Sequence, residues 1–381
     1  MRNRKHLTVL AIAAVIFIIA TIFSESTDHD LSGTGSPLFP DLLAKANDVS
    51  TIRIQTNAGT LNLERDQEMW KVKENNGYPA DINKVRELVL GVGNLIKVEP
   101  KTGKPENYER IGLQDITEKD SPAVHITLNA GAEDVVADLI IGNNKASHAG
   151  DSKMSYYIRG VNDPQSWLVD GKLPDKWEAK DWLDVNIFEI DRSRIKQVIV
   201  DHQDGEKVYI HRIDSSVRDF TLDSLNPGEQ LTAPFEVNNI ATTFTKMTFD
   251  DVVSEKESGA ETTPVYTAKL TTFDGLVITF QPHKKGEIHL VKYSASYDPS
   301  AVSSDAMPDN TDKKQESESD ESKSEHAKPT AKLLSAEEVK QEVTKYNAIW
   351  NGWVYQLPEF RIKNIGKKKA DLLKKDNTPV H

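Results

Sequence analysis

The sequence of 381 residues contains no cysteine. Disulfides, thiolate zinc sites, thiol catalysis and a lipid anchor attached through a thiol are therefore excluded. Basic residues are also in the minority, because 47 Lys and Arg stand against 59 Asp and Glu and the net charge is −12. A nucleic-acid partner needs a basic face, so we expect none. Each folded part of the chain must hold its core by packing alone.

The sequence also lacks the short motifs of common enzyme classes. It has no G-x-S-x-G elbow and no H-E-x-x-H helix, and Gly103-Lys104 is followed by proline rather than by the Ser or Thr of a phosphate loop. Gly91-Val92-Gly93 lacks the third glycine of a dinucleotide-binding turn. We therefore expect a protein that is not an enzyme, and we assign no catalytic, cofactor-binding or metal-binding residue and no cofactor.

Two histidine pairs are candidates for a metal site. His202 and His211 flank one expected hairpin, and His283 and His289 flank another turn. Either pair could reach a metal if its strands pair tightly, since histidine is the commonest metal ligand. Neither pair has a third ligand at motif spacing, so surface strand residues are the preferred interpretation.

Acidic and aromatic clusters offer two further candidates. The acidic cluster comprises Asp181, Asp184, Glu189 and Asp191. The aromatic cluster comprises Trp167, Trp177, Trp182, Trp350 and Trp353. Paired carboxylates in a cleft can hydrolyse glycosidic bonds, and aromatic surfaces can stack on sugars or on partner side chains. A charged linker and core packing are the simpler interpretations of the two clusters.

The amino end has the pattern of a membrane anchor. Arg2, Arg4 and Lys5 precede an uncharged run from Leu7 to Phe23. At about 1.5 Å per residue, a helix of this length crosses most of a hydrocarbon core about 30 Å thick. Basic residues stay on the cytoplasmic side, so the rest of the chain should face outward. A cleaved signal peptide is the alternative, but residues 22–26 show no A-x-A pattern.

The remaining chain divides by composition. After a basic cytoplasmic end and transmembrane helix (1–23), we expect a stalk (24–48), a first α+β repeat (49–185), a second α+β repeat (186–360) and a basic tail (361–381). Residues 296–328, within the second repeat, have almost no large apolar side chains and are expected to be a disordered acidic insertion. This insertion is either a tolerated surface loop or an acidic docking segment. The tail is either a solvated end or a contact for the membrane surface.

Alternation and helical spacing predict the elements of the first repeat. Ile52 and Ile54 alternate before the turn Asn57-Ala58-Gly59, and Leu61 and Leu63 alternate after it, which is typical of a hairpin. A helix is expected from the N-cap Asp81 through an apolar stripe that ends near Ile96. Antiparallel strands are expected at 124–128, at 136–141, closed by Gly142-Asn143-Asn144, at 156–159 and at 167–169.

The second half repeats this order. An offset of 155 residues carries the helix stripe Ile82, Val85, Val89 and Val92 onto Val237, Ile240, Phe244 and Met247. Trp167-Leu168-Val169 with Leu173-Pro174 is echoed by Trp353-Val354-Tyr355 with Leu357-Pro358. A further helix is expected from Ser335 to Trp350. We therefore expect two related, duplicated domains of antiparallel strands plus one main helix each, with a cleft between them.

Residues 61–95 and the stretch NYERIGLQD at 107–115, followed by VHITL and the LIIG ending at Gly142, resemble a bacterial family catalogued as a domain of unknown function, DUF4340. The resemblance implies an N-terminal membrane anchor and an envelope role, because members are often encoded beside ABC-2-type transporter subunits related to gliding-motility components. Its motifs are structural, so no active residue is carried over. The acidic insertion and the basic tail depart from the family pattern.

Three functions follow as hypotheses. The first is a single-pass accessory or binding protein of an envelope transport system, located in the bacterial inner membrane with its bulk on the periplasmic face. Its partners would be that membrane and ABC-type transporter subunits, while any small-molecule ligand is left unassigned. The second is an envelope glycan hydrolase that uses the acidic cluster, and the third is a structural spacer.

Overall fold

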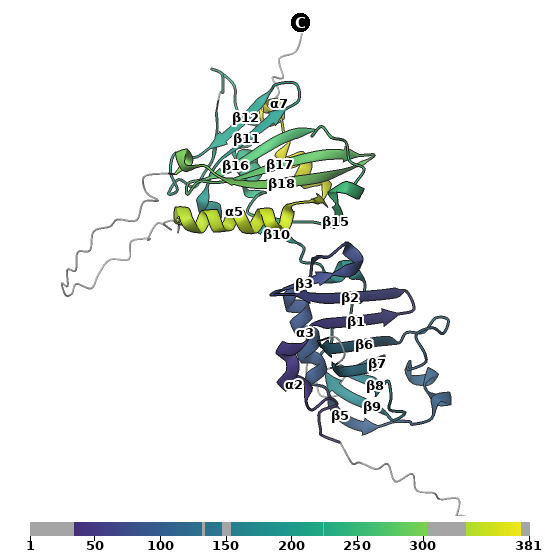
Figure 1. Cartoon of the computed structure of the whole chain (residues 1–381). Coiled ribbons are helices and arrows are strands. Elements are labelled where there is room, and N and C mark those ends of the chain that lie inside the picture. The colour runs from purple at the N-terminus through teal and green to yellow at the C-terminus, as the bar shows by residue number, and fades with distance from the viewer. Residues whose placement is uncertain (1–33, 132–133, 147–153, 224, 303–332, 375–381) are drawn as a thin grey trace, which may run out of the picture. The chain divides into compact units, whose positions relative to one another are not determined.

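A computed structural model describes residues 34–131, 134–146, 154–223, 225–302 and 333–374. The predicted cytoplasmic end and transmembrane helix, residues 1–23, lie outside the described residues, as do residues 303–328 of the predicted insertion. Among the described residues, no helix has the length and apolar character needed to cross a membrane. These residues form mostly antiparallel sheets with a few helices, which confirms the α+β class (Figure 1).

The chain divides into two compact units. Of the described residues, the first unit comprises those up to Glu74 together with those of Ile82–Trp182, and the second comprises Asn75–Asp81 together with those from Leu183 onward. Within the first unit the sheet has the strand order β3-β2-β1-β6-β7-β8-β9-β5. Its strands are β1 (Thr51–Thr56), β2 (Gly59–Asp66), β3 (Met69–Val72), β5 (Ile96–Pro100), β6 (Val124–Ala130), β7 (Asp134–Ala146), β8 (Met154–Gly160) and β9 (Ser166–Gly171), and its helices are α2 (Leu42–Lys45) and α3 (Ile82–Gly93).

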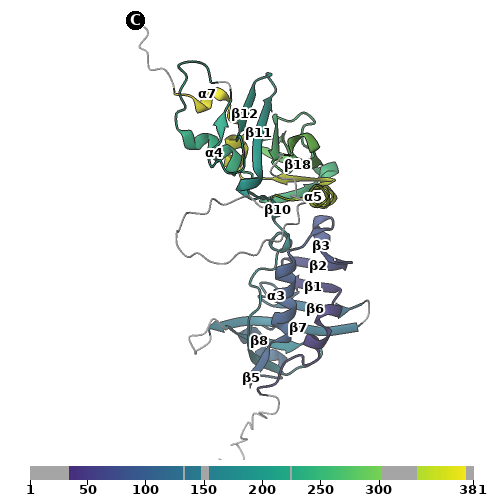
Figure 2. The ribbon, with the colours of Figure 1, turned by 90° about the vertical axis from the view of Figure 1, so that its left-hand side faces the viewer.

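The core of the first unit lies between the sheet and α3. The predicted hairpin is confirmed, since Ile54 pairs with Leu61 and Ile52 pairs with Leu63, and all four side chains are buried. Helix α3 runs along one face of the sheet (Figure 2) and buries Val85, Leu88, Val89 and Val92 against it. Each fully buried aliphatic side chain of this kind contributes about 1.5–3 kcal/mol. The apolar stripe therefore holds the helix to the sheet.

Residues 34–48, which form the second part of the predicted stalk 24–48, fold onto the first unit instead. Backbone hydrogen bonds join Gly35 N to Lys97 O at 2.8 Å and Leu38 N to Leu95 O at 2.8 Å, so this segment follows the edge strand β5. The side chain of Leu42 in α2 is fully buried. An unpaired strand edge offers free backbone groups, and these bonds occupy them. Composition alone did not reveal this pairing because it depends on a strand 60 residues away.

The second unit contains a larger sheet with the order β13-β12-β11-β16-β17-β18-β19-β15 and a two-stranded sheet formed by β10 and β14. Its strands are β4 (Tyr78–Pro79), β10 (Asn186–Glu189), β11 (Ile195–His202), β12 (Lys207–His211), β13 (Thr221–Leu222), β14 (Lys246–Thr248), β15 (Asp251–Ser254), β16 (Tyr266–Thr272), β17 (Leu276–Lys285), β18 (Ile288–Tyr297) and β19 (Trp353–Gln356). Its helices are α4 (Pro234–Thr242), α5 (Ala336–Trp350), α6 (Glu359–Ile365) and α7 (Lys369–Leu372).

Aromatic side chains fill the core of the second unit. Tyr78 is 1% exposed and its ring lies 5.1 Å from that of Trp353, 5.5 Å from that of Phe249 and 6.2 Å from that of Tyr355, all edge-on. Edge-to-face pairs of this kind add about 0.5–1.5 kcal/mol beyond the area they bury. The short segment Asn75–Asp81 is therefore a packed part of the second unit.

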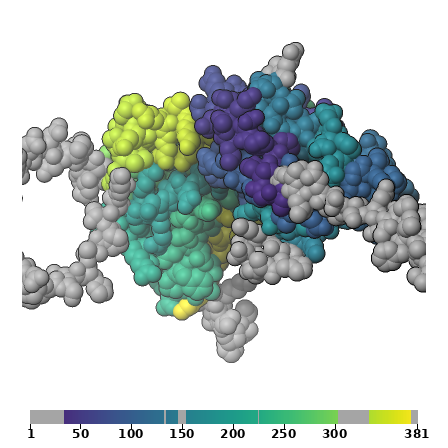
Figure 3. Space-filling view, turned by 90° about the horizontal axis from the view of Figure 1, so that it is seen from below, coloured from purple at the N-terminus to yellow at the C-terminus, as the bar shows by residue number. Residues whose placement is uncertain are grey.

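Helix α5 begins as predicted. Ser335 is its N-cap, and the side chains of Ser335 and Glu338 form a reciprocal capping box. Figure 3 shows this helix in yellow-green on the surface of the second unit. The first residues of the predicted insertion also belong to this unit. Strand β18 continues to Tyr297, and Asp298 N donates to Gly275 O at 2.8 Å. The insertion predicted from residue 296 therefore has an ordered start.

Gly91 in α3 provides a test of this packing. A Cβ at Gly91 would collide with the backbone carbonyl of Lys172, whereas a Cβ at Gly93 would collide with the side chain of Leu43 and touch that of Leu42. We expect Gly91→Ala to lower the free energy of unfolding by about 1–3 kcal/mol, because the collision outweighs the helix-propensity gain of about 1 kcal/mol. Gly93→Ala is the matched control and should cost less, since the Leu43 side chain can rotate away. Urea unfolding of the two variants measures the difference, and a Gly91→Ala protein as stable as the wild type would contradict it.

Candidate functional site

A cavity of about 750 Å³ opens on the first unit, and we call it the Trp177 pocket. Side chains from one helix, three strands and the chain after β9 line it. They come from α3 (Lys84, Glu87), β6 (Val124), β7 (Ile141–Asn144), β8 (Met154, Tyr156), the segment Lys172–Trp177, and Asp181 and Trp182, together with Pro122. Ligand pockets commonly have volumes of about 300–1,000 Å³, so this cavity is large enough for a small molecule.

A bulge in β7 shapes one wall of the Trp177 pocket. Ile141 pairs with Ile158 of β8, but the next pair joins Asn144 to Tyr156, so β7 carries one extra residue. Gly142 is required at the bulge because a Cβ there would collide with the backbone carbonyl of Ile111. The prediction that Gly142-Asn143-Asn144 closes this strand is wrong, because the extra residue lets β7 continue to Ala146.

Two stacked indoles form the aromatic side of the Trp177 pocket. Trp182 is 1% exposed and its Nε1–H donates to Lys176 O at 3.1 Å. Trp177 is half-buried and stacks on Trp182 with ring centroids 6.3 Å apart and an interplanar angle of 25°. The side chains of Trp167, Trp182 and Trp350 are buried, as the core-packing interpretation predicts. Trp177 is different, because it remains partly exposed and lines a cavity.

Charges around the Trp177 pocket balance in number, with three lysines and three carboxylates. These are Lys84, Lys172 and Lys176, and Glu87, Asp175 and Asp181. Lys172 Nζ lies 2.6 Å from Glu87 Oε1, and this hydrogen bond raises the pKa of Lys172. The Lys172 side chain is 77% exposed, so the ion pair contributes little to stability and a ligand can open it.

The structure does not assemble the predicted acidic cluster as a catalytic pair. Asp181 lines the Trp177 pocket, whereas Asp184, Glu189 and Asp191 belong to the second unit. Asp191 caps a short 3-10 turn, where the hydroxyl and backbone N–H of Ser193 bind its carboxylate and lower its pKa. A general acid in glycoside hydrolysis needs a raised pKa, which is the opposite shift.

Strand register separates the two histidine pairs. His211 lies opposite Gln197 in the hairpin, while the backbone N–H of His202 bonds to Glu206 O at the turn end. Five residues of strand therefore separate the pair, about 16 Å. His289 lies opposite Lys284, the neighbour of His283, so these two side chains point to opposite faces of the sheet. Across the described residues, no group of three or more His, Asp or Glu is arranged to hold a metal.

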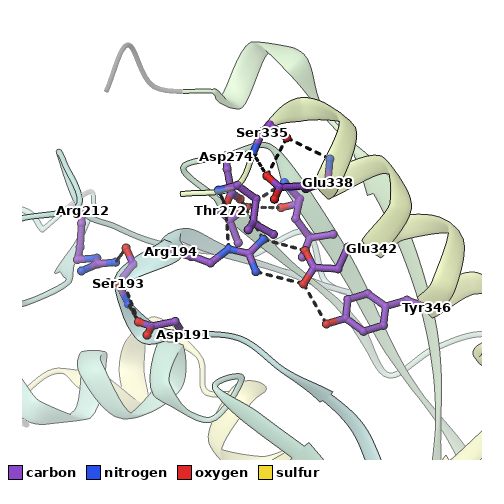
Figure 4. A network of polar contacts seen from close by, with 12 residues as sticks. Asp191, Ser193, Arg194, Arg212, Thr272, Asp274, Ser335, Glu338, Glu342 and Tyr346 are labelled. Carbon is purple, nitrogen blue, oxygen red and sulfur yellow. Dashed lines mark hydrogen bonds and ion pairs between the residues drawn. The ribbon is translucent and has the colours of Figure 1, made fainter. Parts of the chain in front are cut away.

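A buried charge network lies in the second unit (Figure 4). Arg194 Nε donates to Asp274 Oδ2 at 2.8 Å, and its Nη2 donates to Glu342 Oε2 at 2.8 Å. The side chains of Arg194 and Asp274 are 9% and 0% exposed. Tyr346 OH also donates to Glu342, and Leu334 N donates to Asp274 Oδ2 at 3.1 Å. The network thus ties both α5 and the chain before it to the β16–β17 turn, which is a structural role.

Arg212 is the second buried arginine near this network. Its guanidinium donates to the backbone carbonyls of Ile195, Val217, Arg192 and Ser193. Burial, together with the neighbouring charge of Arg192, lowers its pKa to about 10. Because carbonyl dipoles surround the cation, the residue fastens the start of β11 and leaves no donor arrangement typical of a ligand site.

The described part of the predicted basic tail, residues 361–374, folds onto the second unit. Ile365 and Leu372 are fully buried, and Lys367 and Lys368 are paired with Glu236 and Asp204. Lys369 Nζ lies 2.6 Å from Glu229 Oε2. These lysines therefore already have acidic partners within their own unit, which weakens the interpretation of the tail as a membrane contact.

A comparison with models of protein families gives a match. A family model described as a domain of unknown function (DUF4340) matches residues 70–269, which is more than half of the chain. No curated protein and no solved structure matches the chain. The function of the chain is therefore inferred from its sequence and from the geometry of the site.

The buried network predicts a large effect of removing Arg194. We expect Arg194→Ala to destabilise the second unit by about 3–5 kcal/mol, because Asp274 would remain fully buried, and Glu342 partly buried, without their cation. Arg218→Ala, at an exposed position, is the control and should stay within about 0.5 kcal/mol of the wild type. Denaturant unfolding followed by tryptophan fluorescence measures both. Equal stability of the two variants would show that the network contributes nothing.

The ion pair between Lys369 and Glu229 predicts that the stability of the second unit falls in acid. Lys369 and the backbone N–H of Asn226 lower the pKa of Glu229 to about 2. An unfolded glutamate titrates at about 4.3, so the stabilisation from Glu229 is complete above that pH and is lost as the pH falls toward 2. We expect the urea midpoint to fall less between about pH 5 and about pH 3 in Glu229→Gln than in the wild type. Glu287→Gln, an exposed position in the β17–β18 turn, should follow the wild type.

Proposed function

The chain belongs to the family described as a domain of unknown function (DUF4340), and we propose that it is a single-pass, membrane-anchored accessory or binding protein of an envelope transport system. One observation carries the proposal, namely the uncharged run Leu7–Phe23 behind Arg2, Arg4 and Lys5. A run of this length and flanking charge is typical of an inner-membrane anchor with the following chain outside the cytoplasm. The bulk of the protein then works on the periplasmic face.

We further propose that the two units arose by duplication. In each unit three strands form a meander at one side of the main sheet, β1-β2-β3 in one and β11-β12-β13 in the other. In each, a strand that follows the main helix pairs with the last strand: β5 pairs with β9, and β15, which comes after α4 and β14, pairs with β19. This agreement in strand order supports the repeat that the sequence offset of 155 residues indicates. The acidic insertion between β18 and β19 then distinguishes the second copy.

The proposed role is binding without covalent chemistry. The Trp177 pocket supports it, because its charges balance in number and Glu87 is engaged in an exposed ion pair with Lys172. ABC-type transporter subunits are the proposed partners, on the strength of the family resemblance. A glycan hydrolase is the weaker alternative, because the pKa of Asp191 is lowered and its carboxylate is engaged in capping.

The orientation of the protein in the membrane tests the proposed anchor. We expect protease added to spheroplasts to digest the folded units of the full-length protein, and its mature amino terminus to be Met1. Ile16→Lys with Ile19→Lys should abolish anchoring, because each charge at a helix centre costs about 2.5–3.5 kcal/mol in the membrane. Ile16→Leu with Ile19→Leu is the matched control and should stay anchored. Digestion only from the inner face, or a mature chain starting near Glu25, would contradict the proposal.

The same membranes test the partnership. Extraction in mild detergent followed by mass spectrometry should recover ABC-type transporter subunits with the wild type and with the leucine control. Loss of these subunits in the lysine variant would be consistent with assembly at the membrane. A wild-type protein that brings down no transporter subunit would favour a structural spacer instead.

A further inference from the structure

We infer that the Trp177 pocket binds an uncharged saccharide. The inference rests on the proposed binding role but not on the membrane anchor, so either can fail alone. Its first support is the aromatic platform. Trp177 is partly exposed and is held in place by stacking on the buried Trp182, whose indole N–H is bonded to the backbone. A rigid aromatic face suits the apolar C–H face of a sugar ring and loses little conformational entropy on binding.

Polar groups elsewhere in the lining suit sugar hydroxyls. Asn143 and Asn144 enter the lining at the β7 bulge, and each side-chain amide offers donors and an acceptor. Glu87 and Lys172 add a carboxylate and an ammonium whose mutual ion pair is exposed. A hydroxyl can accept from an ammonium and donate to a carboxylate at once, so a sugar can replace the contacts of this pair. Binding therefore leaves no charged group without a partner.

Charge balance selects against the other ligand classes. The lining carries three lysines and three carboxylates, so it presents no field of one sign. Phosphorylated ligands and acidic peptides would meet the carboxylates, and cationic ligands would meet the lysines. A neutral, hydroxyl-rich ligand avoids both penalties. The lining is also too polar for a purely apolar ligand, because buried polar groups without partners cost free energy.

The test uses the full chain in phospholipid nanodiscs, because sugar-headed detergents would compete for the pocket. Chitotriose and maltotriose are the probes, and saturation-transfer NMR with isothermal titration gives the affinity. We expect at least one of the two to bind. Trp177→Ala should weaken that binding at least about tenfold, and Asn144→Ala should weaken it several-fold. Phe360→Ala removes an aromatic side chain that is 66% exposed and lies outside the pocket, so its affinity should equal that of the wild type.

The outcomes separate the two proposals. Failure of both saccharides to bind, or equal binding by Trp177→Ala, Asn144→Ala and the wild type, would overturn the inference while leaving the anchor and partner results intact. If Trp177→Ala does not fold, Asn144→Ala at an exposed position decides the question. Recovery of shortened sugars after incubation would support the ligand class and would contradict a role without catalysis.

Discussion

Packing of one apolar sheet face against a covering helix is the interaction on which both units depend. Without cysteine there is no crosslink, so Leu88 and Val92 of α3 and Val237 and Ile240 of α4, all fully buried, have to hold helix and sheet together. Antiparallel hairpins supply a wide sheet from short connections, which gives these helices enough apolar area to cover. A small second cluster around Leu113 and Ile140 packs on the first unit outside the α3 stripe. The pocket wall formed by Lys84 and Glu87 therefore belongs to α3, the helix whose buried stripe packs on the sheet of the first unit.

The charge network of the second unit follows a different logic from this apolar packing. Burying Arg194 with Asp274 removes both charges from water, which costs free energy. The ion pair offsets this cost only because the guanidinium donates hydrogen bonds to both Asp274 and Glu342. An apolar contact would tolerate several positions of α5, whereas the fixed donor geometry of a guanidinium is satisfied in only one position of the helix. Because the acidic insertion separates β18 from α5 in the sequence, a directional contact fixes where the helix returns. The turn that carries Asp274 also binds the chain just after β18, because Gly275 O accepts a hydrogen bond from Asp298 N.

Local patterns predicted the features of the fold that depend on neighbouring residues. Alternation at Ile52 and Ile54, the stripe of α3 and the capping box of Ser335 and Glu338 involve residues within a hairpin or a helix turn, where spacing determines geometry. Long-range features escaped prediction. The segment 34–48 pairs with β5, and His202 and His211 are separated by a register that no composition reveals. The members of the acidic cluster are close in sequence, yet Asp191 caps a 3-10 turn in the second unit and Asp181 lines a pocket in the first.

The Trp177 pocket combines both kinds of feature, which explains why sequence alone identified its aromatic residue but not its function. Trp177 and Trp182 are close in the chain, so their stacking is local. Asn144 reaches the lining only through the β7 bulge, and Glu87 only through the docking of α3. Gly142 and Gly91 permit these two approaches, because a side chain at either would strike a backbone carbonyl. Two glycines that weaken their own strand and helix are therefore the residues that allow the walls of the cavity to form.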